Sequence, residues 1–209
     1  MIPMESTEAN EINIQMFKDL KEKAYKASED MAQEYGEAPY TKGYGRRNTT
    51  LLAIAPTTSS AFIIGQASQS IEPWFSNCYV KDLAKLKVTI KNKYLEKLLE
   101  EKGKNDREIW NSIRDRDGSV QHLDFLSEQE KNVFKTFTEI NQYVIIDQAA
   151  DRQKYIDQGQ SLNLMIDPKT PVKQINELYL AAWNQGIKTL YYQHSKSAAQ
   201  ELTRKIVCS

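Results

Sequence analysis

The amino-acid sequence predicts an α/β fold. Apolar runs of strand length at 51–55, 162–166 and 189–192 alternate with stretches in which apolar residues recur every three or four positions. Strand, helix, strand, helix, strand is the order of a parallel sheet with helical crossovers. Three such strands with their helices cannot close a barrel, so the predicted sheet is incomplete on its own.

Composition places this fold in a soluble protein. The chain has 209 residues, enough to bury a core, and its 28 basic and 28 acidic residues give a formal net charge of zero. Zero net charge argues against binding to nucleic acid or to an anionic membrane. The sequence has no signal peptide and no apolar run of membrane-spanning length. With only Cys78 and Cys208, a disulfide framework is not expected, and we predict a cytoplasmic protein.

Residues 1–36 are predicted to form a polar N-terminal tail, frayed over residues 1–9, followed by an amphipathic helix. Gly36 is a natural helix stop. The apolar stripe of this helix would dock on a sheet or on another chain, and its members are Phe17, Leu20, Ala24, Ala27 and Met31. Residues 37–193 are expected to form the main domain, and residues 194–209 a polar C-terminal tail.

The run 51–55 has no polar alternation, which predicts a buried strand. A turn rich in hydroxyl groups follows it and precedes a second apolar run; we call Pro56, Thr57, Thr58, Ser59 and Ser60 the diphosphate turn. Hydroxyls and unpaired backbone N–H groups at a helix start bind phosphate well. The alternative is that Thr57 or Thr58 simply caps the helix.

Charged residues dominate 81–118, which predicts a surface excursion from the main domain. Ser127 and Glu130 have the spacing of a capping box. The helix that it starts is expected to break near 136–139 and to end by about 157–159. Its buried side would include Val133, Phe134, Phe137, Ile140 and Val144. On its other, solvated side we expect Asp147, Asp151 and Asp157.

The last predicted helix begins near Pro171, with Thr170 or Asp167 as its cap, and places Tyr179 and Trp183 in the core. The strand after it ends in Tyr191 and Tyr192, which we call the tyrosine pair. Tyrosine can lose an electron and a proton together, so two phenols in contact can relay a radical. Successive strand residues point to opposite faces, so contact between these rings requires the strand to end or twist there.

The other candidate side chains suggest packing. Cys78 is expected to be packed and unreactive, because free cysteine is often buried. His122 and His194 have no companions at ligand spacing, so no metal site is predicted in this chain.

The strings 47–60 and 70–73, together with 186–194, resemble the C-terminal part of the large, catalytic subunit of class I ribonucleotide reductase. The resemblance extends over roughly residues 30–209, about the last quarter of such a subunit. It implies the C-terminal part of a ten-stranded α/β barrel. It also implies that residues 56–60 hold the substrate diphosphate and that Tyr192 and Tyr191 pass an oxidising equivalent towards an active-site cysteine. Cys208 would be a tail thiol, although the family's tail carries a pair of cysteines and here a single cysteine is followed by Ser209, so either the chain is truncated or this tail cannot act alone.

The resemblance also implies what this chain lacks. The reacting cysteines and the catalytic carboxylate of the family lie upstream, so we expect a fragment of a ribonucleoside-diphosphate reductase that is inactive alone, such as one product of a split gene. Its partners would be an upstream fragment, a small subunit with a metal or tyrosyl radical cofactor, and thioredoxin or glutaredoxin as external thiol reductant. This chain would bind no cofactor itself. The alternative to a core position for Tyr179 and Trp183 is a groove for the small subunit's C-terminal peptide, which family members bind near this region. The alternative is a non-catalytic module that binds the small subunit or the upstream fragment.

Overall fold

The computed structural model describes residues 1–65, 68–83 and 86–195. The chain divides into two compact units. Unit 1 comprises Met1–Ser6 and Thr57–Ile140, and unit 2 comprises Thr7–Pro56 and the chain from Asn141 onward. Both contain helices and strands, which confirms the α/β class, and the described strands form no closed barrel. Among the described residues, no helix is long and apolar enough to cross a membrane.

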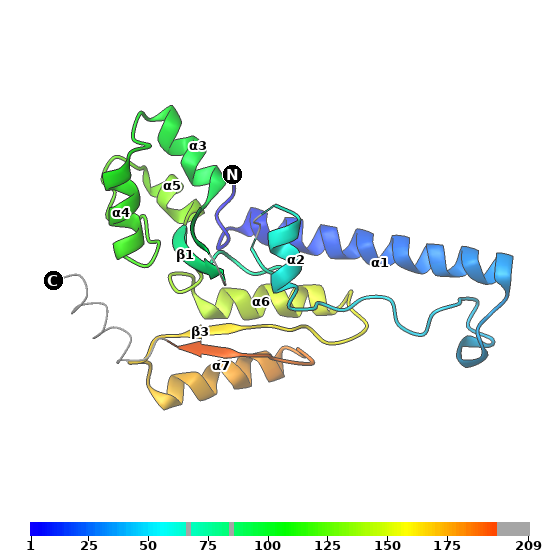
Figure 1. Cartoon of the computed structure of the whole chain (residues 1–209). Helices are drawn as coiled ribbons and strands as arrows, with labels where there is room; N and C mark the ends of the chain where they lie inside the picture. Colours follow the sequence, from blue (N-terminus) through cyan, green and yellow to red (C-terminus); the bar gives the residue numbers. More distant parts are fainter. Residues whose placement is uncertain (66–67, 84–85, 196–209) are drawn as a thin grey trace. The chain divides into compact units, whose positions relative to one another are not determined.

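Three helices form the frame of unit 2: α1 (Thr7–Tyr35), α6 (Gln142–Gln153) and α7 (Val172–Asn184). A short 3-10 helix, η1 (Pro39–Thr41), follows α1. Helix α6 lies alongside α1 and also packs on α7 (Figure 1). Its buried residues Ile146 and Ala149, with Leu178 of α7, form the apolar centre of this unit.

Three chain segments of unit 2 run parallel, with 158–166 in the middle. On one side Gln158 N–H donates to Leu52 C=O and Ser161 N–H to Ile54 C=O. On the other side β3 (Leu164–Ile166) pairs with β4 (Gln193–Ser195). The parallel arrangement predicted from the sequence is therefore present, although 51–55 forms only an isolated bridge at Ile54.

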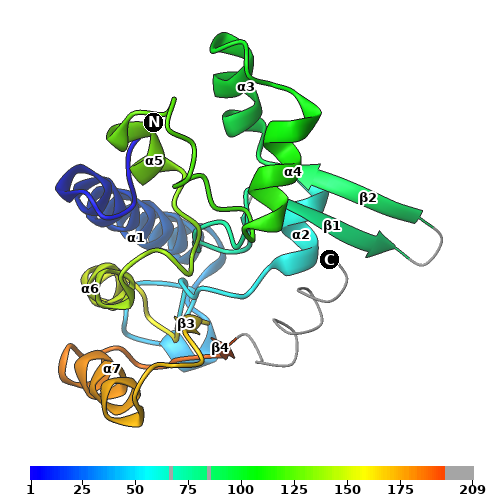
Figure 2. The same ribbon diagram turned by 90° about the vertical axis from the view of Figure 1, so that its left-hand side faces the viewer.

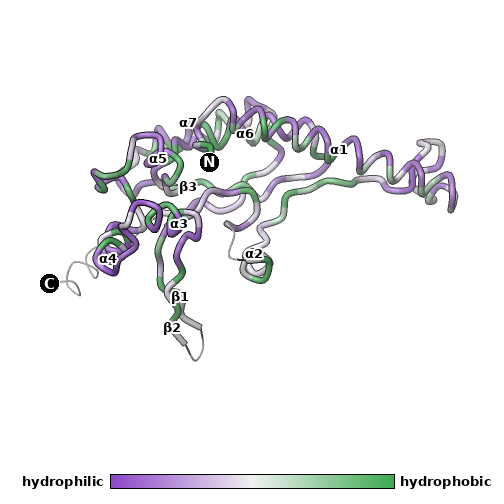
Figure 3. Tube along the Cα trace, turned by 90° about the horizontal axis from the view of Figure 1, so that it is seen from above, coloured by the Kyte–Doolittle hydropathy of each residue, from purple (hydrophilic) through white to green (hydrophobic). Residues whose placement is uncertain are grey.

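The prediction that 51–55 is buried is wrong. Leu51 and Leu52 are half-buried and Ala53 is exposed, although the segment that leads into α2 is coloured hydrophobic in Figure 3. An apolar run becomes fully buried only when layers cover both of its faces.

Asp147 is exposed, as predicted, whereas Asp151 and Asp157 are half-buried, and all three aspartates accept hydrogen bonds from other parts of unit 2. Asp151 accepts a hydrogen bond from Asn10 of α1 at 2.9 Å, and Asp147 accepts one from Gln185 at 2.7 Å. Asp157 lies after α6, which ends at Gln153 rather than near 157, and its carboxylate accepts from Tyr25 Oη at 2.6 Å and from two backbone N–H groups at 51–52. Burial raises the pKa of Asp157, but these hydrogen bonds outweigh burial and the net pKa is lowered.

Helix α1 ends at Tyr35, as predicted, and Gly36 follows with a positive φ of 76°. It begins earlier than the predicted tail allows, at Thr7. Of the predicted stripe Phe17 is buried, whereas Leu20 and Met31 remain 46% and 42% exposed. The reason is length: α1 has 29 residues and α6 has 12, so α6 covers only part of α1 (Figure 1).

Unit 1 contains an antiparallel hairpin, β1 (Cys78–Leu83) with β2 (Leu86–Lys91), and four helices. The helices are α2 (Thr58–Ile63), α3 (Lys93–Glu101), α4 (Arg107–Asp115) and α5 (Glu128–Val133), and Figure 2 shows α3 and α4 next to the hairpin. The stretch predicted as a charged surface excursion supplies much of the core of this unit. Its buried apolar residues include Leu95, Leu99, Trp110 and Ile113. Helices α3 and α4 are short and amphipathic. Charged residues dominate the composition of this stretch, so its apolar side was not recognised from the sequence.

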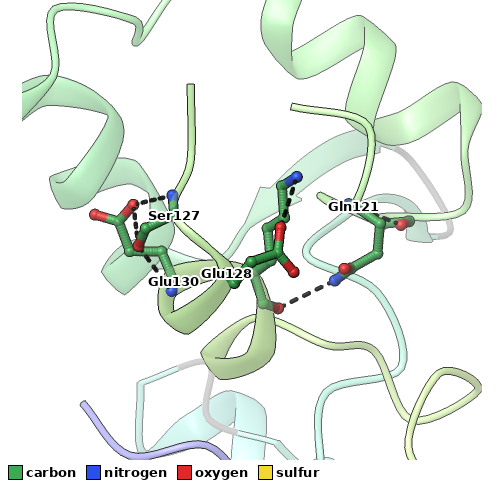
Figure 4. A network of polar contacts seen from close by, with 6 residues as sticks. Gln121, Ser127, Glu128 and Glu130 are labelled. Carbon is green, nitrogen blue, oxygen red and sulfur yellow. Dashed lines mark hydrogen bonds and ion pairs between the residues drawn. The ribbon is translucent and has the colours of Figure 1, made fainter. Parts of the chain in front are cut away.

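The capping box at α5 is confirmed, because Ser127 Oγ accepts from Glu130 N–H while the Glu130 carboxylate accepts from Ser127 N–H (Figure 4). The predicted break near 136–139 is confirmed, but it is wider than predicted, because the helix ends at Val133 and the next one begins only at Gln142. Phe134, Phe137 and Ile140 are buried in the connection between the helices rather than along one helix side.

Asn77 links the hairpin to the rest of unit 1. Its buried amide donates to Gly118 C=O at 2.9 Å and to Phe134 C=O at 2.7 Å, while its own carbonyl oxygen accepts from Asn92 at 2.8 Å. Gly118 adopts a φ of 88°, and a Cβ there would lie 2.5 Å from Asn77 N. The close approach between these two segments therefore requires glycine.

Candidate functional site

The rings of the tyrosine pair are in contact. Their centroids are 4.1 Å apart with an interplanar angle of 52°, and both residues are exposed, Tyr191 by 46% and Tyr192 by 58%. The neighbouring phenol of Tyr192 raises the pKa of Tyr191. This is the geometry that proton-coupled transfer between the two side chains would need.

The predicted strand 189–192 is wrong, and the reason explains the ring contact. Tyr191 N–H donates to Leu162 C=O, but Leu164 N–H donates to Tyr192 C=O, so both tyrosines lie opposite Asn163. Two residues opposite one define a β-bulge, a rare feature in parallel pairs that re-aims side chains. Regular pairing resumes with Leu164 opposite Gln193 in β4.

His194 extends the pair, and sequence analysis missed it. Its ring centroid lies 5.8 Å from that of Tyr192, with an interplanar angle of 60°. The signal was present, because residues two apart in a strand point to the same face. It was overlooked because residues from 194 onward were predicted to be a polar tail, whereas β4 includes His194.

Tyr191 also lines a cavity of about 430 Å³ in unit 2, together with Pro56. The structure thus brings together residues from two predicted site segments that are far apart in sequence. The rest of the lining consists of residues 53–55, 158–161, Thr189 and Leu190. Gly159 allows close packing here, because a Cβ at this position would lie 2.6 Å from Thr189 Oγ1.

A network of hydrogen bonds among polar residues holds Gln160 and Thr189, which line this cavity, in place. Arg152, 3% exposed, donates from Nε to Gln160 Oε1 at 2.6 Å. The backbone N–H of Gln160 donates to Thr189 Oγ1 at 2.9 Å, and the Thr189 hydroxyl donates to Gln160 C=O at 2.7 Å. These contacts join the middle strand to the chain just before the tyrosine pair.

The diphosphate turn starts α2, as predicted, but its first two hydroxyls do not cap the helix. Thr57 is the N-cap residue in a left-handed conformation (φ 42°) and makes no side-chain capping bond. Its Oγ1 accepts from Ser70 N–H at 2.9 Å, and Thr58 Oγ1 donates to Gln69 Oε1 at 2.9 Å. Ser59 and Ser60 are exposed. The side-chain cap considered as the alternative is therefore absent.

Gln69 and Glu72 hold the diphosphate turn in place through hydrogen bonds, a role that the sequence did not reveal. Gln69 Nε2 donates to the carboxylate of Glu72, a buried residue, at 2.8 Å. Thr58 and Gln69 also line a second, largely apolar cavity of about 370 Å³ in unit 1. The turn is therefore held by a chain of hydrogen bonds from Thr58 through Gln69 to Glu72.

Cys78 is buried and unpaired as a thiol, and burial raises its pKa, which confirms the prediction of a packed cysteine. Cys208 lies outside the described residues. His122 Nε2 is 3.0 Å from Ser112 Oγ. The described part of the chain contains no group of three or more His, Cys, Asp or Glu residues that could hold a metal ion.

Helix α7 presents an apolar face to solvent. The prediction that Trp183 and Tyr179 lie in the core is wrong, because they are 78% and 41% exposed. Val172 and Leu180 are exposed on the same helix. The predicted caps Thr170 and Asp167 are also absent: the N-cap of α7 is Pro171, without a side-chain capping bond.

Comparisons with known proteins point to one enzyme family. The family model described as "Ribonucleotide reductase, barrel domain" matches residues 39–193. Ribonucleoside-diphosphate reductase large subunits of Invertebrate iridescent virus 3 and of Danio rerio are 41% and 34% identical, over 94% and 96% of this chain. The solved alpha subunit of the Actinobacillus ureae class Id ribonucleotide reductase is 52% identical, with a TM-score of 0.88 over the whole of this chain.

The chain spans only part of these proteins. It covers 32% of the viral subunit, 29% of the Danio rerio subunit and 37% of the Actinobacillus ureae chain. A match to the barrel family over residues 39–193 nevertheless includes the diphosphate turn and the tyrosine pair. The chain therefore belongs to the ribonucleotide reductase family, as a C-terminal segment of the large, catalytic subunit.

Proposed function

We propose that this chain is part of a class I ribonucleotide reductase that reduces ribonucleoside diphosphates at the 2′ position by radical chemistry. It supplies the turn that binds the substrate diphosphate and the last two relay residues. The observation that supports this most directly is the 4.1 Å contact between Tyr191 and Tyr192 at a cavity that Pro56 also lines. The names of the relatives, ribonucleoside-diphosphate reductases, suggest the substrate class.

In the proposed relay, Tyr192 gives one electron and one proton to an oxidised group in a small subunit. The resulting Tyr192 radical takes an electron and a proton from Tyr191, whose ring lies against it at 4.1 Å between centroids. The Tyr191 radical then takes a hydrogen atom from a cysteine thiol in an upstream fragment. Each tyrosine is either a neutral phenol or a neutral phenoxyl radical after every step, so no charge is left at the rim of the cavity.

The groups that remain available to bind the diphosphate are the donors that make no hydrogen bond within the turn. Thr57 and Thr58 oxygens already bond to Ser70 and Gln69. The first helical hydrogen bond joins Ala61 N–H to Thr57 C=O, so the backbone N–H groups of residues 58–60 have no acceptor within the helix. With the exposed hydroxyls of Ser59 and Ser60, these donors can bind several phosphate oxygens.

Replacing both Ser59 and Ser60 by alanine is expected to weaken diphosphate binding by about 1–3 kcal/mol, the scale of hydrogen bonds to charged groups. The backbone donors remain, so binding is reduced rather than lost. The measurement is substrate affinity in the complete complex. Thr89→Ala, which removes an exposed hydroxyl from β2 of the same unit, is the control and should bind normally. Equal affinity of the double variant and the control would exclude these hydroxyls from the site.

The proposed partners are an upstream fragment with the reacting cysteines, a small subunit with a metal or tyrosyl radical cofactor, and thioredoxin or glutaredoxin as reductant. The exposed apolar side chains of α7, above all Trp183, provide a surface for the small subunit's C-terminal peptide. Cys208 is proposed as a tail thiol that needs a second cysteine from elsewhere.

The purified chain is expected to show no reductase activity alone. Mixing it with an upstream fragment and a radical-bearing small subunit should give turnover of ribonucleoside diphosphates with a thiol reductant. The measurement is deoxyribonucleoside diphosphate formed over time, with each component omitted in turn. Turnover by this chain alone would contradict the division of roles.

The exposed face of α7 also favours a second candidate, a non-catalytic module that binds the small subunit or the upstream fragment. The same omission series distinguishes the two. If the other components turn over equally well without this chain, the binding role remains and the catalytic role is excluded.

A further inference from the structure

The two tyrosine rings touch because of the bulge, and the bulge leaves a backbone N–H group without its usual acceptor. Two residues of one strand face a single residue of the other, so the partner strand offers one backbone acceptor too few. Leu162 C=O already accepts from Tyr191, and Leu164 N–H already donates to Tyr192 C=O. Tyr192 N–H is therefore left without a backbone acceptor on the neighbouring strand.

The side chain of Asn163 provides the missing acceptor. Its Oδ1 accepts from Tyr192 N–H at 3.0 Å, and the residue is 2% exposed. It lies between Leu162 and Leu164, which are also buried. An amide in such an apolar run is costly to bury unless it is hydrogen-bonded, so the bulge accounts for a polar residue at this position.

We infer that Asn163 is the positioning residue of the tyrosine pair: its side-chain carbonyl holds the bulge that turns both rings to the same side. Without the bulge, residues 191 and 192 would alternate across the strand and the rings would separate. Asn163 itself takes no part in the transfer of electrons or protons. The ring placement stands on this geometry, and its consequence for turnover rests on the function proposed above.

The test compares Asn163→Leu, which has the same branching at Cγ but no acceptor, with Asn163→Asp, which keeps an acceptor oxygen. Asn13→Leu is the matched control. Asn13 is another buried asparagine of unit 2, it donates to Gln148 C=O, and it lies on α1 rather than beside the tyrosine pair. Both leucine variants remove a buried amide, but only one removes the support of the bulge.

The first measurement uses the full chain alone, with fluorotyrosine at position 191 and fluorine NMR over an alkaline pH series. In the wild type the adjacent Tyr192 phenol raises the pKa of this phenol. We expect Asn163→Leu to lower the pKa to the value found with Tyr192→Phe, while Asn13→Leu leaves it unchanged. If Asn163→Leu folds and keeps the wild-type pKa, the inference is overturned.

The second measurement is turnover in the reconstituted complex. Asn163→Leu should lower kcat by roughly 100-fold, the cost of misplacing a reacting group by about 1 Å, with KM for the diphosphate unchanged. Asn163→Asp should recover most of kcat. If the wild-type complex shows no turnover, the proposed function fails, and the NMR measurement still decides the role of Asn163.

If Asn163→Leu does not fold, the same hydrogen bond can be removed from its other side. Replacing the backbone amide N–H of Tyr192 by an ester oxygen deletes the donor and keeps every side chain. Loss of the raised pKa in this ester variant supports the inference, and an unchanged pKa overturns it.

Discussion

Tyr191→Phe and Tyr192→Phe are each expected to reduce turnover of the reconstituted complex below detection. Phenylalanine keeps the ring but has no O–H proton to give up and is far harder to oxidise. Substrate binding and small-subunit binding should survive, because neither needs the phenol oxygen. The measurement is diphosphate reduction, with thermal unfolding of each variant recorded beside it.

Tyr40→Phe is the matched control for this experiment. Tyr40 lies in η1 of the same unit, is 89% exposed and belongs to neither the proposed relay nor the proposed docking surface. If the tyrosine pair were structural, all three variants would lose about 0.5–1.5 kcal/mol of stability or less and keep their activity. Near wild-type turnover by a folded Tyr191 or Tyr192 variant would remove that tyrosine from the mechanism.

Gly118→Ala is expected to destabilise unit 1 by about 2–5 kcal/mol. The added Cβ would lie 2.5 Å from Asn77 N and 2.7 Å from Ser76 Cα, and the φ of 88° is unfavourable for alanine. Left-handed backbone costs about 1–2 kcal/mol and overpacking a further 1–3 kcal/mol, against a typical total of roughly 5–15 kcal/mol. The shift would also disturb the hydrogen bond from Asn77 to Gly118 C=O.

Gly103→Ala separates backbone strain from crowding, since Gly103 has a φ of 65° but no atom within 4 Å of an added Cβ. It should cost only about 1 kcal/mol. Denaturant unfolding followed by tryptophan fluorescence reports on unit 1, because Trp110 is buried in its core while Trp183 in unit 2 is already 78% exposed. Equal losses in both variants would show that the close approach to Asn77 is not what requires glycine.

Local sequence signals determined two of the helix ends. The capping box of Ser127 and Glu130 fixed the start of α5, and Gly36 fixed the end of α1. These signals succeed because the atoms involved are within a few residues of one another. Local signals do not specify which side of a helix packs against the rest of the chain. This is why the predicted stripe of α1 proved to be partly exposed and Trp183 proved to lie outside the core.

The candidate site shows the same division. The sequence alone determined the chemistry of the site: adjacent phenols at 191–192 and hydroxyls at 57–60, in strings that resemble one enzyme family. Only the tertiary structure decided how these groups are held. The rings touch because Asn163, far away in sequence, accepts the N–H of Tyr192 in a bulge, and Thr58 is held by Gln69. Such contacts depend on strand register and on the pairing of distant segments, and residue type and spacing alone do not specify these.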